Sequence, residues 1–465
     1  MPRWVLPLAL LLAGAAFIAG LRIYNERSTS EINGQLWIPK AAVITPEVAL
    51  LQQYVRIDTS NPPGNELPGA KFLAGILAKD GIRAEIIESA PGRANVYARI
   101  GGRQRGGGLL LLNHMDVVPA SKQGWTRPPF AAEVFQNQLY GRGTLDMKGI
   151  ALCELLAFAE LARTHRTPEH DVVFLATADE EAGGGKGVVW LLEHRPDIFE
   201  GIRYGINEGG ITETTQERIS YFGIEIGTKM TVRVKLRAPE RQSMQALRIA
   251  LEPFISPVDA GRVLPEVQEF LHDLAPLRVE QKQYLDDISR TIAAGKLWLM
   301  PSGYRELTQN ILWPSAVESD ARGATMLVTL VNLPDENPDA RIEWLRGVAG
   351  RYGVTIEDVI EKTGPAPLSS RHTPMFGLIA AESGRQYGAK VGSEILAAST
   401  NDSRYLRARG IDMYGLMPFP TDWYQTLGIH SIDERVRVDW FNSGVALLRH
   451  ITSRFAFEQT GLTSG

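Results

Sequence analysis

The stretch Leu109-Leu110-Leu111-Leu112-Asn113-His114-Met115-Asp116 decides how this chain is expected to fold. Four consecutive leucines are typical of a β-strand that is buried on both faces, as the strands of a parallel sheet are. A histidine and an aspartate follow at the carboxyl end of that strand. Because sites in open α/β sheets form outside the carboxyl ends of the strands, this stretch predicts both the sheet and the position of its site.

The same order of strand, polar cluster and helix recurs further along the chain. Residues 147–163 are predicted to form an apolar helix, residues 171–176 a second buried strand and residues 204–207 a short third strand. Strands that alternate with helices predict an α/β layer with a largely parallel sheet. The polar side chains at the carboxyl ends of these strands are His114, Glu180, Glu181 and Glu208.

The pattern changes about halfway along the chain. Residues 230–236 alternate apolar and polar side chains, which is typical of a half-exposed antiparallel strand. Helices and a further strand follow, so residues 225–360 are predicted to form a second, α+β domain. The sheet pattern returns in residues 412–415, so this domain is predicted to be inserted between two parts of the first, residues 43–224 and 361–460.

Length and composition limit the possible classes of protein. With 465 residues the chain is too long for one compact core, which agrees with two domains. A formal net charge of -4 gives no basic footprint for nucleic acid, so no nucleic-acid partner is expected. Cys153 is the only cysteine, which excludes an intrachain disulfide and a thiolate zinc site. A metal ion must therefore be held by carboxylates and by some of the eight histidines.

The N-terminus carries a separate signal. Residues 4–21 form an uncharged, mostly apolar run of 18 residues, at the lower limit for a membrane-spanning helix and the upper limit for a signal-peptide core. We expect residues 1–22 to be a signal anchor or a cleaved signal peptide, followed by a polar tether over residues 23–42. The body of the protein is then translocated. It is membrane-anchored by this single segment, or secreted or periplasmic if the segment is cleaved.

Two of the polar stretches have plain interpretations when each is taken alone. His114 and Asp116 point the same way in an extended segment, so Asp116 can fix the tautomer of a metal-bound His114. A chance His-X-Asp at a strand end is the alternative. Asp146 lies in the glycine-bracketed loop 141–149, where it can bridge two cations or cap the helix that follows.

The stretch Asp179-Glu180-Glu181 is harder to explain without a ligand. Three adjacent carboxylates after a buried strand repel one another unless cations or protons compensate, although a solvated acidic turn is the alternative. In the functional interpretation one glutamate binds a metal ion and its neighbour is a general base. Glu208 adds another carboxylate at a strand end. His430 follows a glycine in a loop, where a histidine is usually an ordinary surface residue.

Together these residues supply two histidines and three carboxylates as metal ligands. That set is sufficient for two zinc ions about 4 Å apart that share one bridging aspartate. Such a site lowers the pKa of a water molecule, and a free glutamate can take its proton and pass it to a leaving amine. The sequence therefore predicts a two-metal site that hydrolyses an amide bond.

In order and spacing, these motifs resemble the co-catalytic zinc metallopeptidase family of aminoacylase, carboxypeptidase S, carboxypeptidase G, acetylornithine deacetylase and succinyl-diaminopimelate desuccinylase. The resemblance covers nearly everything after about residue 41. It is strongest to the carboxypeptidase S branch, through the N-terminal segment and the stretches Asp58-Thr59-Ser60-Asn61-Pro62-Pro63-Gly64 and Gly141-Arg142-Gly143-Thr144-Leu145-Asp146-Met147-Lys148-Gly149. It implies an α/β, zinc-peptidase-like catalytic domain with a largely parallel central sheet, plus an inserted α+β lid that serves homodimerisation.

The resemblance also implies how the metal ions are held. Asp146 would bridge two Zn²⁺ ions, for which Mn²⁺ or Co²⁺ could substitute. His114 and Glu208 would hold one of these ions. Glu181 and His430 would hold the other.

The remaining roles concern the reaction. Glu180 would be the general base and Asp116 the partner of His114. Arg404, in Asn401-Asp402-Ser403-Arg404, would bind the free carboxylate of the substrate, for which its planar guanidinium is well suited. The expected enzyme is a carboxypeptidase-like metallopeptidase or N-acyl-amino-acid amidohydrolase. It would cleave a peptide or N-acyl-amino-acid amide bond next to a free carboxylate.

The lid sequence departs from the family pattern. Residues 236–244 lack the expected Gly-His pair, residues 313–322 lack the Asn-X-X-Pro element, and residues 329–334 lack the lid arginine. Losing an oxyanion donor costs on the order of a hundredfold or more in rate. Either Arg237, Arg241 or Arg322 takes the place of the missing lid residues, or the substrate differs from those of the family, or the rate of hydrolysis is low. The alternative function is thus a catalytically weak or inactive homologue that binds peptide-like ligands.

Overall fold

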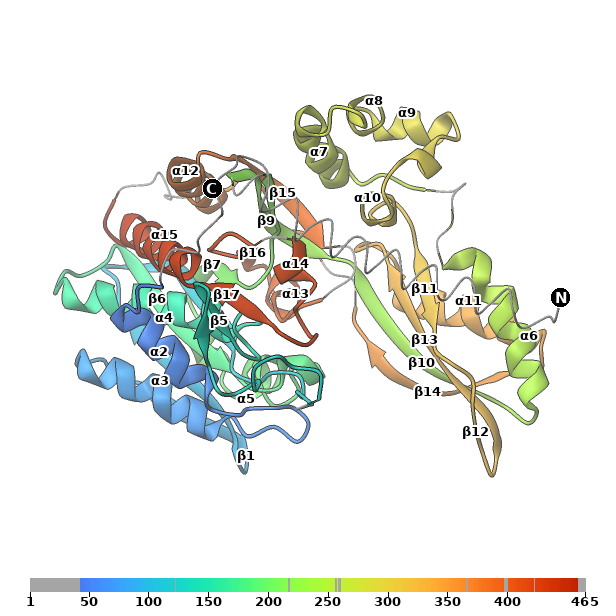
Figure 1. Ribbon diagram of the computed structural model, residues 1–465, viewed down its shortest axis with the longest axis horizontal. Coiled ribbons are helices and arrows are strands. Elements are labelled where there is room, and N and C mark those ends of the chain that lie inside the picture. Colours follow the sequence, from blue (N-terminus) through green and yellow to red (C-terminus); the bar gives the residue numbers. More distant parts are fainter. Residues whose placement is uncertain are drawn as a thin grey trace.

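The computed structural model describes residues 42–458, apart from 122, 216–217, 256, 258–260, 365–366, 397–399 and 422. A large α/β body and a smaller sheet with its own helices lie side by side in Figure 1. The expected signal segment and nearly all of the tether lie outside the described residues. Within the described part of the chain, no helix is both long and apolar enough to cross a lipid bilayer.

The large body is built on one sheet whose strands run in the order β1-β2-β6-β3-β7-β16-β9-β15, with β8 paired to β9. Its strands are β1 (Glu85–Ala90), β2 (Arg93–Ile100), β3 (Gln104–His114), β6 (His170–Thr177), β7 (Ile202–Asn207), β8 (Thr212–Thr215), β9 (Arg218–Thr228), β15 (Lys390–Leu396) and β16 (Asp412–Gly415). The central strands β6, β3, β7 and β16 are parallel. The carboxyl ends of β6, β3 and β7 therefore meet at one edge of the sheet.

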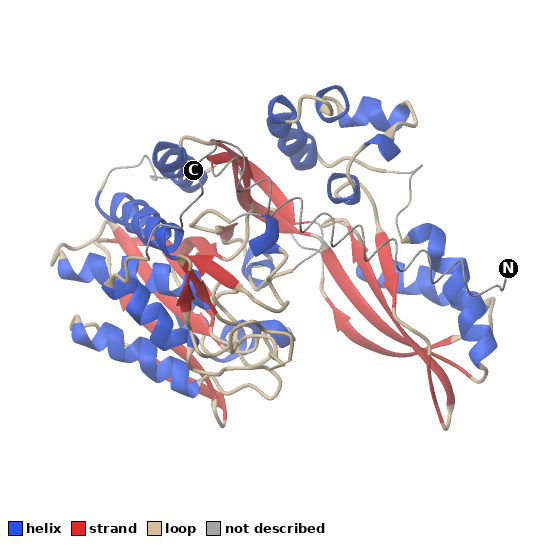
Figure 2. Ribbon diagram, viewed as in Figure 1, coloured by secondary structure: helices blue, strands red, loops and turns tan. Residues whose placement is uncertain are grey.

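Helices cover both faces of this sheet (Figure 2). The helices of the large body are α2 (Pro46–Val55), α3 (Leu67–Lys79), α4 (Lys148–Arg163), α5 (Val188–His194), α12 (Pro374–Tyr387), α13 (Ser403–Arg407), α14 (Trp423–Thr426) and α15 (Val438–Phe457). The four leucines 109–112 are all buried because Leu109 and Leu111 pack in the core with α4 and α15, while Leu110 and Leu112 pack with α5. This alternation confirms the prediction of a strand buried on both faces.

Local sequence signals set the starts of two of these helices. Thr45 caps α2 by accepting a hydrogen bond from the Val48 amide, and Pro46 occupies the first helical position. Thr373 caps α12 in the same way, and Pro374 follows it. A side-chain oxygen satisfies an amide that has no partner within the helix, and proline at the first position loses no hydrogen bond.

The smaller body is a five-stranded sheet with helices on one face, and we call it the lid. Its elements are β10 (Met230–Ala238), α6 (Arg241–Leu251), β11 (Ile311–Pro314), β12 (Glu318–Asp320), β13 (Gly323–Asn332), α11 (Pro338–Gly350) and β14 (Thr355–Lys362). Val232, Val234 and Leu236 of β10 are buried against α6 and α11, and the polar residues between them face away. This is the predicted alternation, and it confirms an α+β lid.

The chain leaves the large sheet through β9, builds the lid, and returns to the large sheet through β15 and β16. β16 lies parallel to β7, with Asp412 paired to Tyr204 and Gly415 to Asn207. β9 extends to Thr228 and the lid strand β14 extends to Lys362, so the lid sheet begins and ends slightly later than the predicted boundaries of 225 and 360.

One segment within the predicted lid packs elsewhere. This segment holds the helices α7 (Pro265–Leu274), α8 (Lys282–Leu285), α9 (Ile288–Ala293) and α10 (Ser302–Glu306), of which α7 lies against β15 (Figure 1). Val267, Phe270 and Leu271 of α7 belong to the core of the large body and not to that of the lid. Amphipathic helices reveal their apolar face in the sequence but not the sheet that this face covers, which is why the sequence placed them in the lid.

Candidate metal centre

A cavity of about 710 Å³ lies between the carboxyl edge of the large sheet and the lid. His114 ends β3, Glu208 follows β7, and Glu180 and Glu181 form a short 3-10 turn after β6. Gly183 and Gly184 end this turn with φ of 96° and 73°, a left-handed conformation that glycine adopts without strain. The acidic stretches predicted at three strand ends are therefore brought to one place.

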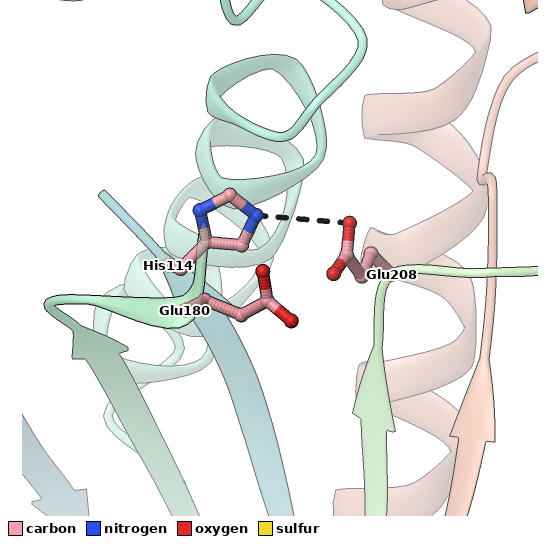
Figure 3. Close-up of side chains that lie close together, drawn as sticks. All are labelled: His114, Glu180 and Glu208. Carbon is pink, nitrogen blue, oxygen red and sulfur yellow. Dashed lines mark ion pairs between the residues drawn. The ribbon is translucent and has the colours of Figure 1, made fainter. Parts of the chain in front are cut away.

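Asp146 stands between the two histidines. Its Oδ1 lies 3.1 Å from His114 Nε2, and its Oδ2 lies 2.9 Å from His430 Nε2. Glu208 Oε2 lies 3.7 Å from the same nitrogen of His114, and the dashed line in Figure 3 marks this ion pair. Glu181 Oε2 lies 3.2 Å from the same nitrogen of His430. The side chains thus form two neighbouring groups, His114 with Glu208 and His430 with Glu181, joined by one carboxylate.

The donor atoms are close enough to share metal ions. Among the described residues, one atom each of His114, Glu180 and Glu208 lie within 4.8 Å of one another, and so do atoms of His114, Asp146 and Glu181. Histidine nitrogens with carboxylate oxygens are a donor set that suits Zn²⁺. Glu180 lies beside His114 and Glu208 in Figure 3, so distance alone does not separate a ligand from a general base.

The charges in this cluster are poorly balanced by the protein itself. Burial and the nearby Asp146 carboxylate raise the pKa of Glu208 to about 7. Burial and the Glu208 carboxylate raise the pKa of Glu180 well above its usual range. Hydrogen bonds to Asp146 and Glu181 raise the pKa of His430 to about 11. The cluster thus favours bound positive charge, whether protons or cations.

One oxygen supports the metal interpretation directly. Glu181 Oε1 is buried and has no hydrogen-bond partner among the described residues. A buried carboxylate oxygen without a partner is costly unless it contacts a cation or water. The residues present therefore fit divalent metal ions.

Asp116 contacts His114 through two groups. His114 Nδ1 lies 2.9 Å from the backbone carbonyl of Asp116 and 3.5 Å from its carboxylate Oδ1. The carboxylate accepts stronger contacts from the Glu180 amide at 3.2 Å and the Glu181 amide at 3.3 Å. Asp116 thus holds the glutamate turn as well as the histidine, a role that the spacing of His114 and Asp116 did not predict.

The loop after α2 supplies residues whose roles the sequence did not reveal. Asn61 Nδ2 donates to Asp116 Oδ2 at 2.9 Å and to Asp179 Oδ1 at 3.0 Å. Arg93 donates to the same Asp179 oxygen at 2.6 Å and forms a two-point contact with buried Glu66. Asp179 is therefore an anchor of the turn that carries Glu180 and Glu181. The only sequence signal for Asn61 was that it lies in the stretch 58–64, which resembles the family. That stretch does not indicate which residues Asn61 contacts.

Glu434 is a second residue that the sequence did not reveal. In the small sheet β4 (Val134–Phe135), β5 (Gln138–Tyr140) and β17 (Arg435–Arg437), β17 pairs with β5. This pairing places buried Glu434 beside the loop that carries Asp146, where it accepts from the amides of Gly143, Leu145 and Asp146 at 3.1, 2.8 and 3.2 Å. Buried Arg142 pairs with it at 2.6 Å.

Arg404 lies in the part of the cavity wall that the large body forms, on α13. The residue is only 6% exposed, and its Nη2 donates to the Tyr405 hydroxyl at 2.9 Å. Its Nε has no hydrogen-bond partner among the described residues. A buried guanidinium with a free donor in the cavity wall suits a carboxylate of a ligand.

The three lid arginines that the sequence offered as substitutes do not line this cavity. Arg237 and Arg322 contact Glu357, and Arg237 also binds Asp320. Arg241 donates to Ser319. These contacts lie at the end of the lid near β12. The structure therefore rules out Arg237, Arg241 and Arg322 as contacts within the cavity.

Known proteins resemble this chain in sequence over part of its length, and in fold over most of it. A probable succinyl-diaminopimelate desuccinylase of Staphylococcus aureus (strain MRSA252) is 39% identical over 137 residues, which is 29% of this chain. The chain matches only 32% of the length of that relative.

Solved structures share the whole fold. An M20 family metallo-carboxypeptidase from Sulfolobus solfataricus superposes with a TM-score of 0.66 at 19% identity, over 88% of this chain and 99% of that one. Human carnosine dipeptidase 1 superposes with a TM-score of 0.64 at 16% identity, over 88% of this chain and 95% of that one. A dinuclear metal-binding M20 peptidase from Bacillus subtilis superposes with a TM-score of 0.53 at 12% identity, over 87% of this chain and 97% of that one. Residues 110–454 match the sequence pattern of one family of peptidase-type hydrolases, and the chain belongs to peptidase family M20/M25/M40.

Proposed function

We propose that the protein is a metal-dependent hydrolase that cleaves a peptide or N-acyl-amino-acid amide bond next to a free carboxylate. One observation carries this proposal: the two oxygens of Asp146 face two different histidines, and each histidine has its own glutamate. Membership of a peptidase family supports amide hydrolysis in general. The buried guanidinium of Arg404 supports recognition of the free carboxylate.

Two divalent cations, which we propose to be Zn²⁺, would be bound at this centre. Asp146 would bridge them, with His114 and Glu208 on one side and Glu181 and His430 on the other. The dinuclear metal-binding relative from Bacillus subtilis and the uncompensated carboxylates support two ions. When bound, such ions polarise the amide carbonyl and make a water molecule at the site more acidic.

Glu180 is the proposed general base. Its carboxylate would accept a proton from the attacking water and deliver it to the nitrogen of the leaving amine. Asp116 would keep Glu180 in place through the backbone amide and hold the ring of His114. Arg404 would orient the substrate by its carboxylate, so that the scissile amide lies over the metal ligands.

A turnover assay tests this proposal. Purified protein with Zn²⁺, Mn²⁺ or Co²⁺ is offered N-acyl amino acids, dipeptides and the same compounds with an amidated α-carboxyl. We expect hydrolysis of the free acids and much slower hydrolysis of the amidated compounds, since Arg404 would lose its partner. If two metal equivalents bind and no compound is hydrolysed, the protein is instead a peptide-binding homologue.

The cellular setting is proposed on the sequence alone. We propose that residues 1–22 anchor the protein to a membrane, or act as a signal peptide, with the enzyme body translocated. Fractionation combined with protease protection tests this, and a soluble form that begins well after Leu21 would exclude the anchor. Homodimerisation through the lid is a family expectation that sedimentation of the purified protein tests.

A further inference from the structure

The part of the cavity wall that the lid forms contains an arginine that does not belong to the metal centre. The lid residues that line the cavity are Arg233, Ile360, Glu361, Lys362 and Thr363. β10 begins beside the catalytic body and runs away from it in Figure 1. Arg233 lies near this beginning, whereas Arg237 lies towards the far end.

The three cations on the exposed face of β10 differ in how they are held. Lys235 contacts Glu357 at 3.1 Å, and Arg237 binds Glu357 at 2.7 Å and Asp320 at 3.0 Å. Arg233 forms one ion pair with the residues that the structure describes, to Glu361 at 3.7 Å, which is too long for a hydrogen bond. Its side chain is 47% exposed, and among the described residues its guanidinium makes no hydrogen bond. Its donors are therefore available to a ligand in the cavity.

The other charged groups of this wall leave room for an anion. Lys362 forms an ion pair with Asp339 at 3.0 Å, so it is not the partner of Glu361. The carboxylate of Glu361 neutralises part of the charge of Arg233. At 3.7 Å from the guanidinium it does not accept a hydrogen bond from it. A carboxylate can make a two-point contact with a guanidinium, and it would displace this loose pair. The apolar neighbour Ile360 would contact the carbon chain that carries the carboxylate.

Two arginines thus line one cavity from two different domains. Arg404 lies in the catalytic body and Arg233 in the lid, and the carboxylates of the metal centre line the same cavity. A substrate whose scissile amide rests on the metal centre would extend its α-carboxylate to one wall and its acyl end to the other.

We propose that Arg233 recognises a second carboxylate on the acyl side of the amide, which makes N-acyl amino acids with an ω-carboxyacyl group the preferred substrates. This proposal rests on the proposed amidohydrolase function and names its substrate class. It also gives the lid a polar contact in place of those that the sequence pattern lacks. Arg233 is a specificity determinant here and takes no part in proton transfer.

The experiment compares substrates that differ by one charge. N-succinyl-leucine and N-succinamoyl-leucine have the same length, and the second replaces the terminal carboxylate by an amide. The zinc-loaded wild type is expected to show a ratio of kcat/KM of about ten or more in favour of the succinyl compound, as a charged hydrogen-bonded contact typically gives. Arg233→Gln should reduce this ratio to about one. Arg237→Gln, on the same face but outside the cavity, should keep the wild-type ratio.

Each outcome decides something different. A wild-type ratio near one, or a ratio that survives Arg233→Gln, overturns the proposal. A charge preference seen for N-acetyl-glutamate over N-acetyl-glutamine, and not for the succinyl pair, overturns the acyl-side assignment. If the succinyl compounds are inert while other N-acyl amino acids or dipeptides are hydrolysed, the proposal for Arg233 fails and the hydrolase function stands; if every compound is inert, the proposed hydrolase function fails. Calorimetric binding of the succinyl pair to wild type and Arg233→Gln then tests Arg233 independently, and equal affinities overturn its role.

Discussion

Glu180 and Glu181 are neighbours in the sequence, yet their surroundings differ. Glu181 points one oxygen at His430, 3.2 Å away, and buries the other without a hydrogen-bond partner. Glu180 lies beside His114 and Glu208, and burial together with the Glu208 carboxylate raises its pKa well above the usual range. This asymmetry supports a ligand role for Glu181 and a proton-transfer role for Glu180.

The first prediction separates these two roles. Glu180→Gln should lower kcat on the order of 100- to 10,000-fold, because the proton acceptor is lost, while metal content stays nearly unchanged. Glu181→Gln should lose metal as well as activity. Kinetics and elemental analysis of both purified variants check this. Loss of metal from Glu180→Gln equal to that from Glu181→Gln would reverse the assignment.

The second prediction concerns Asn61, which joins Asp116 to Asp179. Asn61→Ala leaves these two buried carboxylates without their shared donor, so the glutamate turn and His114 should lose orientation. Metal affinity or activity should fall about 10- to 100-fold, the usual effect of removing a residue that orients metal ligands. Ser60→Ala is the matched control, because within the described part of the chain the Ser60 hydroxyl donates only to the exposed Asp58. Unchanged metal affinity and rate in Asn61→Ala would remove Asn61 from the site.

At the scale of elements, the pairing of β17 with β5 joins two parts of the chain that are nearly 300 residues apart. Glu434 precedes β17, and it accepts from three amides in the loop that carries Asp146. His430 lies four residues before it. The same short sheet therefore sets the distance between Asp146 and His430.

The third prediction tests this link. Glu434→Gln leaves buried Arg142 without its charged partner, and breaking a buried ion pair typically costs about 3–5 kcal/mol. We expect a lower free energy of unfolding and weaker metal binding, measured by denaturation and by metal titration. Glu133→Gln is the control, since the pair of Glu133 with Arg127 is partly exposed and worth about 1 kcal/mol or less. A Glu434→Gln variant as stable as the control would contradict the role assigned to this loop.

At the scale of the whole molecule, the two bodies meet where β9 passes into β10. Lys229 lies at this junction, and its Nζ donates to the carbonyls of Glu306 and Gln309 at 2.8 and 2.7 Å. The side chain is almost fully buried. Burial lowers the pKa of Lys229 from 10.5 to about 7, and the charge of the Glu306 carboxylate acts in the opposite direction.

The fourth prediction follows from this pKa. Between pH 7 and 10.5 the unfolded chain binds the Lys229 proton and the folded protein does not, so the contribution of Lys229 to stability increases as the pH rises. The free energy of unfolding of the wild type, relative to Lys229→Met, should therefore increase between pH 7 and 9, by at most about 1.4 kcal/mol per pH unit. Urea denaturation of both proteins at several pH values checks the sign. A difference that is flat or decreases with pH would show that Lys229 remains charged when folded.

The sequence by itself determined the local elements and the list of polar residues that the fold brings together. Runs such as Leu109 to Leu112 specify buried strands through their composition. The alternation in β10 specifies a half-exposed strand, because side chains alternate between the faces of a sheet. Motifs at strand ends then identify the candidate ligands, since parallel strands bring their carboxyl ends together.

Only the tertiary structure decided which groups meet. In the folded protein the two oxygens of Asp146 face different histidines. Asn61 and Glu434 contact the segments that carry the site residues. The helix α7 packs in the core of the large body and not in that of the lid. The tertiary structure also showed that Arg233 lines the cavity, whereas Arg237, Arg241 and Arg322 do not. These contacts join residues far apart in the chain, and their geometry depends on how whole sheets and helices pack. Neither spacing nor composition records that packing.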